Sequence, residues 1–350
     1  MDTKKIKALG AKTADSPLDT LVIERRVLGV NDVEIDILYC GICHSDLHAV
    51  KNDWGNTNYP VVPGHEIVGR IKDVGKNVTK FKVGDLTGVG CIVDSCRNCD
   101  SCSHGFEQFC ENGFTLVFDG PDKHLAGRTY GGFSESIVMD SNYVLKIPES
   151  LDLASAAPLL CGGITVYSPL KHWKAGPGKK VGIIGIGGLG HLAIKIARAM
   201  GAHVTVFTRS EDKLQDAKRL GAHDAVLSND PEQMRKQSKY DLLIDTVSAK
   251  HEVNMFLDIL NIDGSLVLVG LPNEPLEIGA FNVVNGRKSF SGSNIGGIAE
   301  TQEMLDFFAE HKLAADVEVI KVDQVNEALD RLERGDVKYR FVIDMASLKN

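Results

Sequence analysis

The sequence has no long uninterrupted apolar segment. No run approaches the roughly 18 apolar residues that cross a bilayer. The opening MDTKKIKALG carries lysines, but the apolar stretch of a signal peptide does not follow them. No internal repeat, low-complexity tract or linker stands out either. These absences favour a cytoplasmic protein without a membrane partner.

The sequence also lacks an excess of basic residues. It has 39 Lys and Arg against 47 Asp and Glu, which gives a formal net charge of -8 at pH 7. Binding to nucleic acid or to an anionic membrane surface requires a basic face. Neither partner is therefore expected.

The length and the apolar patterning predict two domains. A chain of 350 residues exceeds one ordinary hydrophobic core. Up to about residue 150, short alternating runs predict a β-rich lobe; they are VEIDILYC, EIVGRIKDVG, ESIVMD and NYVLKIP. From about residue 155 to 290, buried apolar runs alternate with helix-period segments, as in KKVGIIGI followed by LGHLAIKIARAMGA. This alternation predicts a parallel doubly wound sheet.

Four of the eight cysteines lie within the segment SCRNCDSCSHGFEQFC; they are Cys96, Cys99, Cys102 and Cys110. A reducing cytosol disfavours disulfides, so clustered thiols there indicate metal binding or catalysis. The spacing lets one short loop present four thiolates to a tetrahedral ion, which predicts a closed structural zinc site. An iron–sulfur cluster and free thiols are the alternatives.

Three scattered residues have the composition of an open metal site. Cys43 lies in YCGICHSDLH, His65 in PGHEIVG and Cys161 in APLLCGGITVYS. Two thiolates and one imidazole leave zinc a fourth position for water or substrate. Spacing alone does not connect the three, because a lone buried cysteine is more often a small core residue.

A glycine motif lies between a predicted strand and a predicted helix. Gly185, Gly187 and Gly190 form GIGGLG, a pattern that allows a tight turn and brings backbone close to a pyrophosphate. The following helix would direct its N-terminus at the phosphates. A glycine turn without a ligand is the alternative.

The segment VFTRSEDK bears on the choice of nicotinamide cofactor. An NAD site expects an acidic residue at the end of the second strand. This chain offers hydroxyls and cations for a 2′-phosphate instead, which favours NADP; they are Thr208, Arg209, Ser210 and Lys213. The alternative is that Ser210 caps a helix and Glu211 selects NAD.

Motifs along nearly the whole chain are similar to those of zinc-dependent medium-chain dehydrogenases/reductases. The closest resemblance is to the cinnamyl-alcohol dehydrogenase group, including its bacterial broad-range aldehyde reductases. Besides the segments above, these motifs are VGCIVDSCRNCDSC, VGIIGIGGLGH, LIDTVSA, LVLVG, GSNIGG, ETQEMLDF and YRFVID. The segments LVF after Phe114-Thr115 and GDLTGVG depart from the commoner forms, and they bear on substrate range more than on reaction type.

The resemblance implies an α/β chain with three segments. A GroES-like β-rich catalytic domain with both zinc sites would cover residues 1–153, and a Rossmann doubly wound NADP-binding domain would cover 154–292. Residues 293–350 would pack back on the catalytic domain. A homodimer joined near residues 287–293 is expected, although tetramers also occur among relatives.

The resemblance also joins the scattered ligands into one catalytic zinc site. Cys43, His65 and Cys161 would hold the ion. Glu66 would approach the metal when water or substrate exchanges; its alternative role is to orient His65.

A proton relay is implied by the same segment, CHSDLH. Ser45 would pass a proton through the cofactor ribose to His48. His44 would lie near the cofactor phosphates.

Further contacts follow from the resemblance alone. The additional cofactor residues would be Thr165, Gly188, Leu189, Thr246, Val247, Val269, Gly270, Ser293 and Asn294. The substrate pocket would include Trp54, Cys91, Phe118 and Ile295.

The resulting functional hypothesis is a reversible alcohol dehydrogenase that reduces aldehydes with NADPH, including aromatic, cinnamyl-type aldehydes. It would carry two Zn2+ ions per chain, one catalytic and one structural. The alternatives are an NAD-dependent polyol or secondary-alcohol dehydrogenase and a non-catalytic nicotinamide-binding protein.

Overall fold

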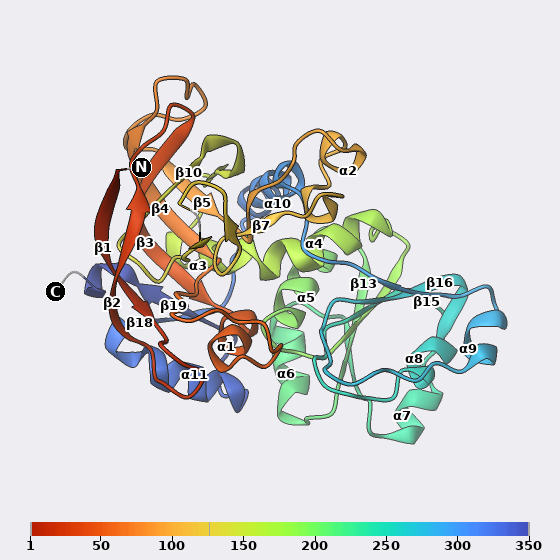
Figure 1. Cartoon of the computed structure of the whole chain (residues 1–350). Helices are drawn as coiled ribbons and strands as arrows, with labels where there is room; N and C mark the ends of the chain where they lie inside the picture. Colours follow the sequence, from red (N-terminus) through yellow and green to blue (C-terminus); the bar gives the residue numbers. More distant parts are fainter. Residues whose placement is uncertain (1, 126, 349–350) are drawn as a thin grey trace. The chain divides into compact units, whose positions relative to one another are not determined.

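The computed structural model describes residues 2–125 and 127–348, and the chain divides into two compact units (Figure 1). The first unit combines Met1–Cys161 with Gly296–Asn350, and the second is Gly162–Ile295. The domain boundaries after residues 153 and 292 follow from the family resemblance and stay predictions.

The first unit is built on a seven-stranded sheet in the order β11-β5-β4-β3-β19-β18, with β10 also paired to β3. Its strands are β3 (Asp32–Ile42), β4 (Ile67–Val74), β5 (Leu86–Val89), β10 (Ser136–Asp140), β11 (Leu145–Lys146), β18 (Val317–Ile320) and β19 (Arg340–Asp344). The C-terminal β19 pairs antiparallel with β3, with Phe341 opposite Ile42. Residues from both ends of the chain therefore share one sheet.

Shorter elements surround this sheet. The strands β1 (Thr3–Gly10) and β2 (Asp19–Arg26) form an antiparallel pair. Two-stranded pairs also join β6 (Ile92–Asp94) to β7 (Thr115–Leu116) and β8 (Pro121–Asp122) to β9 (Gly127–Arg128). The helices are α1 (His44–Lys51), α2 (Asp100–Ser103), α3 (Leu153–Ala156), α10 (Ile298–Glu310) and α11 (Val325–Glu333). In α11, the buried Val325, Ala328, Leu329 and Leu332 repeat with helical periodicity and form its apolar face.

The second unit contains a six-stranded sheet in the order β14-β13-β12-β15-β16-β17, and every pair is parallel. Its strands are β12 (Lys180–Ile184), β13 (His203–Thr208), β14 (Asp224–Leu227), β15 (Tyr240–Asp245), β16 (Leu260–Leu268) and β17 (Ser289–Gly292). The central β12 and β15 are almost entirely buried, as expected for parallel strands covered on both faces. The predicted parallel doubly wound sheet is confirmed.

Helices connect these strands. They are α4 (Gly162–His172), α5 (Gly190–Ala199), α6 (Asp212–Arg219), α7 (Pro231–Arg235), α8 (Asn254–Asp258) and α9 (Ala280–Val284). The strand order reverses between β12 and β15, which both continue into loops at their carboxyl ends. Such a reversal opens a crevice where doubly wound sheets bind ligands.

None of the single helices in the described ranges is long and apolar enough to span a membrane. One bent pair, Leu153–Leu160 with Gly162–His172, meets that criterion by length and composition.

Candidate functional site

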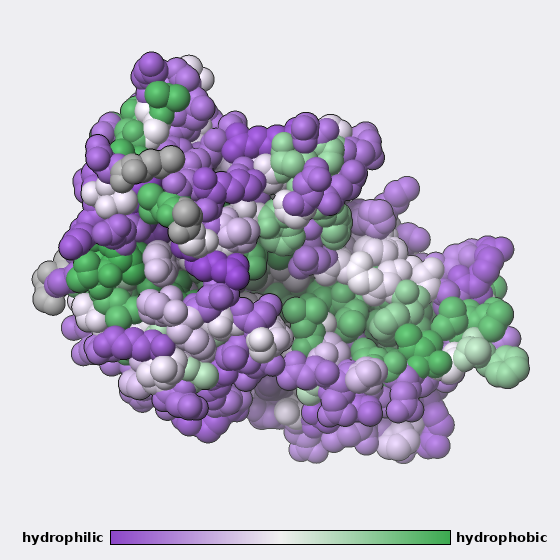
Figure 2. Space-filling view, in the orientation of Figure 1, coloured by the Kyte–Doolittle hydropathy of each residue, from purple (hydrophilic) through white to green (hydrophobic). Residues whose placement is uncertain are grey.

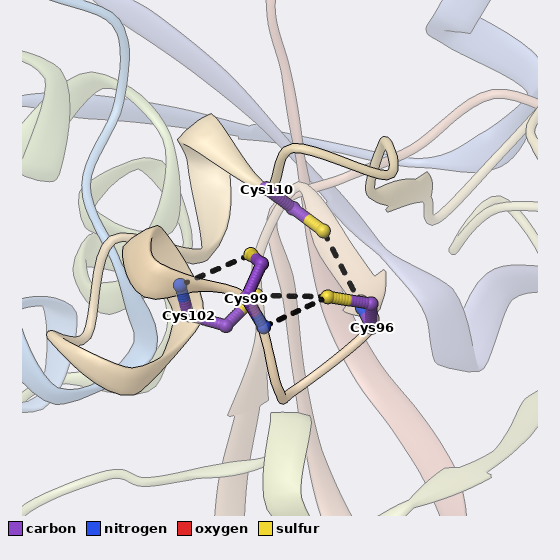
Figure 3. Close-up of side chains that lie close together, drawn as sticks. All are labelled: Cys96, Cys99, Cys102 and Cys110. Atoms are coloured by element: carbon purple, nitrogen blue, oxygen red, sulfur yellow. Dashed lines mark hydrogen bonds between the residues drawn. The ribbon is translucent and has the colours of Figure 1, made fainter.

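Four cysteine side chains converge in the loop that contains α2 (Figure 3). The ligand atoms of Cys96, Cys99, Cys102 and Cys110 all lie within 4.8 Å of one another. The loop curls because Cys99 caps α2, with its sulfur accepting a hydrogen bond from the Cys102 amide at 3.5 Å. Four protein ligands leave no open position, so the arrangement suits a structural Zn2+.

Hydrogen-bond donors favour the thiolate form at Cys96, whereas desolvation raises the pKa of Cys102 to about 11. The Cys99 amide donates to Cys96 Sγ at 3.4 Å, and the Cys96 amide donates to Cys110 Sγ at the same distance. The side chain of Asn112, followed by backbone amides, lowers the pKa of Cys96 to about 6. A deprotonated sulfur is the form that binds a metal.

A second cluster brings together the scattered ligands. Cys43 follows β3 directly, His65 and Glu66 precede β4, and Cys161 follows the 3-10 helix η3 (Ala157–Leu160). Because β3 and β4 are neighbours in the sheet, their ends lie close together. The ligand atoms of these four residues lie within 4.8 Å of one another.

A hydrogen bond orients the imidazole of His65 and leaves its second ring nitrogen available to bind a metal. Its Nδ1 lies 2.9 Å from Oδ1 of Asp46, and Asp46 is fully buried. Its Nε2 is buried and has no hydrogen-bond partner among the described residues. A carboxylate that accepts from Nδ1 fixes the tautomer in which Nε2 can bind a metal.

Only one of the two carboxylate oxygens of Glu66 has a hydrogen-bond partner among the described residues. Its Oε1 accepts a hydrogen bond from the guanidinium of Arg340 on β19, whereas Oε2 is buried and has no partner in the described part of the chain. Burial, opposed by the charge of Arg340, raises the pKa of Glu66 to about 7. Gly41 permits this position, because a Cβ there would lie 2.0 Å from Oε2 of Glu66.

The cluster favours a thiolate at Cys43. A hydrogen bond from Cys161, assisted by the charge of Arg340, lowers the pKa of Cys43 despite its burial. Two thiols, one imidazole nitrogen and one free carboxylate oxygen form a donor set that fits Zn2+ with an exchangeable fourth position.

Helix α1 carries the predicted relay residues. The Ser45 hydroxyl lies 3.9 Å from Cys43 Sγ. One turn further along, Nδ1 of His48 lies 2.7 Å from Oδ2 of Asp53, and its ring centroid lies 5.3 Å from that of Trp54. His44, at the start of the helix, is exposed.

The glycine motif lines a pocket in the second unit. Gly185 has a φ of 91°, and a Cβ on Gly190 would lie 2.2 Å from the Gly185 carbonyl oxygen. A Cβ on Gly187 would meet no atom within 4 Å, so this backbone is open to a ligand. The pocket measures about 430 Å³ and includes these predicted residues: Gly185, Gly187, Thr208, Arg209, Ser210, Lys213, Thr246 and Val247.

The charges of this pocket are mainly positive. The Arg209 guanidinium makes no hydrogen bond or ion pair with any described residue, and Lys213 Nζ donates to the Ile186 carbonyl at 3.2 Å. Glu252 is the one acidic side chain among the described residues that line the pocket, and Glu211 is not on its wall. This environment suits a phosphate at the position where NAD sites have an acid.

Other predicted cofactor residues lie outside the lining of this pocket. Gly188 and Leu189 complete the loop before α5, Val269 and Gly270 follow β16, and Ser293 and Asn294 follow β17. Thr165 is buried within α4.

The predicted substrate residues have different surroundings. The ring of Phe118 is buried 5.7 Å from that of His65, and Trp54 is 44% exposed beside His48. Cys91 approaches Cys161 closely enough for a hydrogen bond between their thiols. Ile295 has a φ of 36° at the end of the second unit.

The sequence does not predict three residues of the site: Asp46, Asp53 and Arg340. Each supports a predicted residue through a hydrogen bond, to His65, His48 and Glu66 respectively. Asp46 lies within CHSDLH and Asp53 follows His48 by five residues, but an acid close to a histidine is too common to be a signal. Arg340 is 274 residues from Glu66, and only the β3–β19 pairing brings them together.

Family models match both parts of the chain. The alcohol dehydrogenase GroES-like domain matches residues 29–149, and the zinc-binding dehydrogenase matches residues 188–310. With the two ligand clusters, these matches define a zinc-binding dehydrogenase. They confirm the predicted GroES-like and Rossmann-type fold classes.

Similar proteins narrow this class. The NADP-dependent alcohol dehydrogenase C 1 of Mycolicibacterium smegmatis is 53% identical over 99% of this chain and 99% of its own. The aldehyde reductase YahK of Escherichia coli is 53% identical over 98% of this chain and 99% of its own. A cinnamyl alcohol dehydrogenase structure from Sorghum bicolor has a TM-score of 0.95 and 48% identity, covering 98% of each chain. The chain belongs to the zinc-containing medium-chain dehydrogenase/reductase family, close to the cinnamyl alcohol dehydrogenases.

Proposed function

We propose that this protein is a zinc-dependent alcohol dehydrogenase that reduces aldehydes to primary alcohols with NADPH and runs the reaction in both directions. The observation that carries the proposal is the cluster of Cys43, His65 and Cys161, in which the buried His65 Nε2 has no hydrogen-bond partner among the described residues. Relatives of this chain are named NADP-dependent alcohol dehydrogenase and aldehyde reductase, and these names describe the same class of reaction as the one proposed.

Cys43, His65 and Cys161 would hold the catalytic ion. Zinc supplies a Lewis acid that polarises a carbonyl oxygen, and the nicotinamide supplies the hydride. Asp46 keeps His65 in the ligating tautomer. Glu66 would approach the ion through Oε2 when water or substrate exchanges, while Arg340 donates a hydrogen bond to Oε1.

The proton for the product oxygen would come from helix α1. The Ser45 hydroxyl lies 3.9 Å from Cys43 Sγ and would donate its proton to the substrate oxygen. His48 would then reprotonate Ser45 through the cofactor ribose, as the family resemblance implies. Asp53 accepts from Nδ1 of His48, which orients the ring and leaves Nε2 for proton transfer.

The second unit would bind the cofactor. The open backbone at Gly187 would accept the pyrophosphate, and the N-terminus of α5 would stabilise its charge. Thr208, Arg209, Ser210 and Lys213 would bind the 2′-phosphate, because they combine hydroxyls with cations on one wall.

We assign a broad aldehyde range that includes aromatic substrates. Phe118 and Trp54 provide aromatic surface beside His65 and His48. Cys91 would complete this surface of the first unit, and Ile295, in the second unit, stays a predicted substrate residue.

A homodimer in the cytoplasm completes the proposal. The second unit exposes a set of large apolar residues: Ile262 (73%), Leu271 (65%), Ile278 (41%), Phe281 (79%) and Val284 (68%). Figure 2 shows hydrophobic surface over this end of the unit, around α8 and α9. Neighbouring β17 is the last strand of its sheet, which leaves an edge for pairing with a second copy.

Metal removal tests this function. Dialysis against a chelator should abolish NADPH-dependent aldehyde reduction, and added Zn2+ should restore it, because the carbonyl is not polarised without the ion. Magnesium added at the same concentration is the control, since it prefers oxygen ligands to thiolates. Activity that persists in protein stripped of its zinc would reject the proposal.

A further inference from the structure

His251 forms part of the wall of the nucleotide pocket but belongs to none of the binding motifs. It lies in the loop between β15 and α8, and it lines the pocket together with Arg209, Ser210 and Lys213. Its side chain is only 12% exposed. A histidine enclosed at this position can influence any phosphate that the pocket holds.

Both ring nitrogens of His251 face hydrogen-bond acceptors. Nε2 lies 2.9 Å from the carboxylate Oδ2 of Asp245, and Nδ1 lies 2.9 Å from the carbonyl oxygen of Ala249. Neutral imidazole has one donor nitrogen and one acceptor nitrogen, whereas the imidazolium has two donors. Satisfying both contacts therefore requires the doubly protonated, positively charged ring.

The negative charge of the pair lies behind the ring. Asp245 is fully buried and does not line the pocket, and its other oxygen accepts from the Val247 amide at 3.1 Å. The ring, in contrast, is on the pocket wall. The pair thus presents its cationic end to a bound nucleotide.

The remaining charges near the ring come from four elements. Asp245 ends β15, Arg209 follows β13, Lys213 belongs to α6, and Glu252 lies on the same loop as His251. The hydrogen bond with Asp245 raises the pKa of His251, against the effects of burial and of the Arg209 charge. The imidazolium is therefore favoured even beside another cation.

We propose that His251 is a specificity-determining residue that favours the 2′-phosphorylated cofactor by placing a fixed imidazolium on the pocket wall. Since both nitrogens are bound to protein, the ring acts through its charge and not through a hydrogen bond to the phosphate. The proposal rests on the proposed NADP(H) function, and it adds a residue from a different loop to the phosphate-binding set.

Two adenosine ligands isolate this effect from catalysis. Calorimetric titration of the full chain with 2′,5′-ADP and with 5′-AMP gives a ratio of dissociation constants that reports the 2′-phosphate alone. His251→Gln keeps a polar group for Asp245 but removes the charge. We expect this variant to reduce the preference for 2′,5′-ADP about fivefold, as for one partly hydrated ion pair.

Two further variants distinguish charge from loop structure. His251→Lys retains a cation and should recover most of the preference. His203→Gln disrupts another histidine–aspartate pair of the same unit, 2.7 Å from Asp224 at the opposite end of β13, and should leave the preference unchanged. If His251→Gln weakened the binding of both ligands equally, or weakened the binding of neither, the proposal would be overturned.

The pH dependence gives a second readout. From about pH 7 to about pH 9 the 2′-phosphate is already ionised, since its second pKa is near 6. The preference of the wild-type protein should fall over this range as His251 loses its proton, and that of His251→Gln should not. A wild-type protein that binds both ligands equally would overturn the NADP(H) assignment as well. A preference that is identical in both proteins at every pH would overturn only the role of His251.

Discussion

His65 Nε2 and Glu66 Oε2 are the two buried polar atoms of the ligand cluster that lack hydrogen-bond partners among the described residues. An unpartnered buried polar group costs about 1–3 kcal/mol, so its retention requires a compensating interaction. A metal ion bound by these two atoms and the thiols would provide that interaction. The partners Asp46 and Arg340 hold both groups in the orientation that the ion needs.

Replacing one zinc-ligating residue should remove the catalytic metal without unfolding the protein. Cys161→Ser and His65→Ala should each remove one of two zinc ions per chain and lower aldehyde reduction at least about 100-fold. Zinc analysis and circular dichroism check both expectations. Cys40→Ala is the matched control, because Cys40 is a buried cysteine outside both clusters. A variant that keeps full activity would contradict the assignment of these ligands.

Asp53 should affect proton transfer through His48. Asp53→Asn removes the carboxylate that accepts from Nδ1, and we expect kcat to fall about tenfold with little change in the KM for NADPH. Steady-state kinetics measures this difference. Glu333→Gln is the control, since Glu333 pairs with Lys51 on the same helix but at the exposed surface. Equal kinetics in both variants would exclude a role for Asp53 in the relay.

Single residues differ in how far the sequence predicts them. The spacing of Cys96, Cys99 and Cys102 is local, so it predicts a metal loop without any knowledge of the fold. Cys43, His65 and Cys161 are far apart, and only the family resemblance joined them. Asp46 and Arg340 could not be found, because their roles depend on contacts that exist only in the folded sheet.

At the scale of elements, the α2 loop depends on its four sulfurs. It contains a helix of only four residues and a 3-10 turn, η1 (Glu107–Phe109), with little apolar burial of their own. A bound metal would therefore replace a hydrophobic core in this segment.

A change in one of these cysteines should act on stability. Cys99→Ser should release the structural zinc and lower the free energy of unfolding by about 4 kcal/mol, within the range for loss of a metal. Thermal unfolding and limited proteolysis of residues 96–110 would measure it. Ser103→Ala is the control, since Ser103 lies on α2 but is not a ligand. Unchanged stability and zinc content would contradict the structural role.

Elements with a strong period were predicted well, and short ones were not. The apolar runs that alternate with helix-period segments in residues 180–268 predicted the parallel sheet correctly, because strands buried on both faces are apolar throughout. Helix α1 was not anticipated, since HSDLHAVK is short and polar and starts directly after a strand. The run NYVLKIP contributes only the two-residue β11, after a 3-10 turn at Ser141–Tyr143.

At the scale of the whole molecule, the exposed apolar residues around α9 determine the expected assembly. Burying a phenylalanine stabilises an interface by about 1.5–3 kcal/mol. Phe281→Glu should therefore convert the proposed dimer to a monomer, as measured by light scattering after gel filtration. Val22→Glu is the control, because Val22 is 67% exposed on β2, in the other unit. A Phe281→Glu protein that stays dimeric would place the interface elsewhere.

The initial rate of cinnamaldehyde reduction with NADPH and with NADH, on protein whose zinc content has been measured, tests the proposed function directly. We expect fast turnover with NADPH, little with NADH, and close to two zinc ions per chain. No turnover with either cofactor, in protein that holds both ions, would contradict the proposed function.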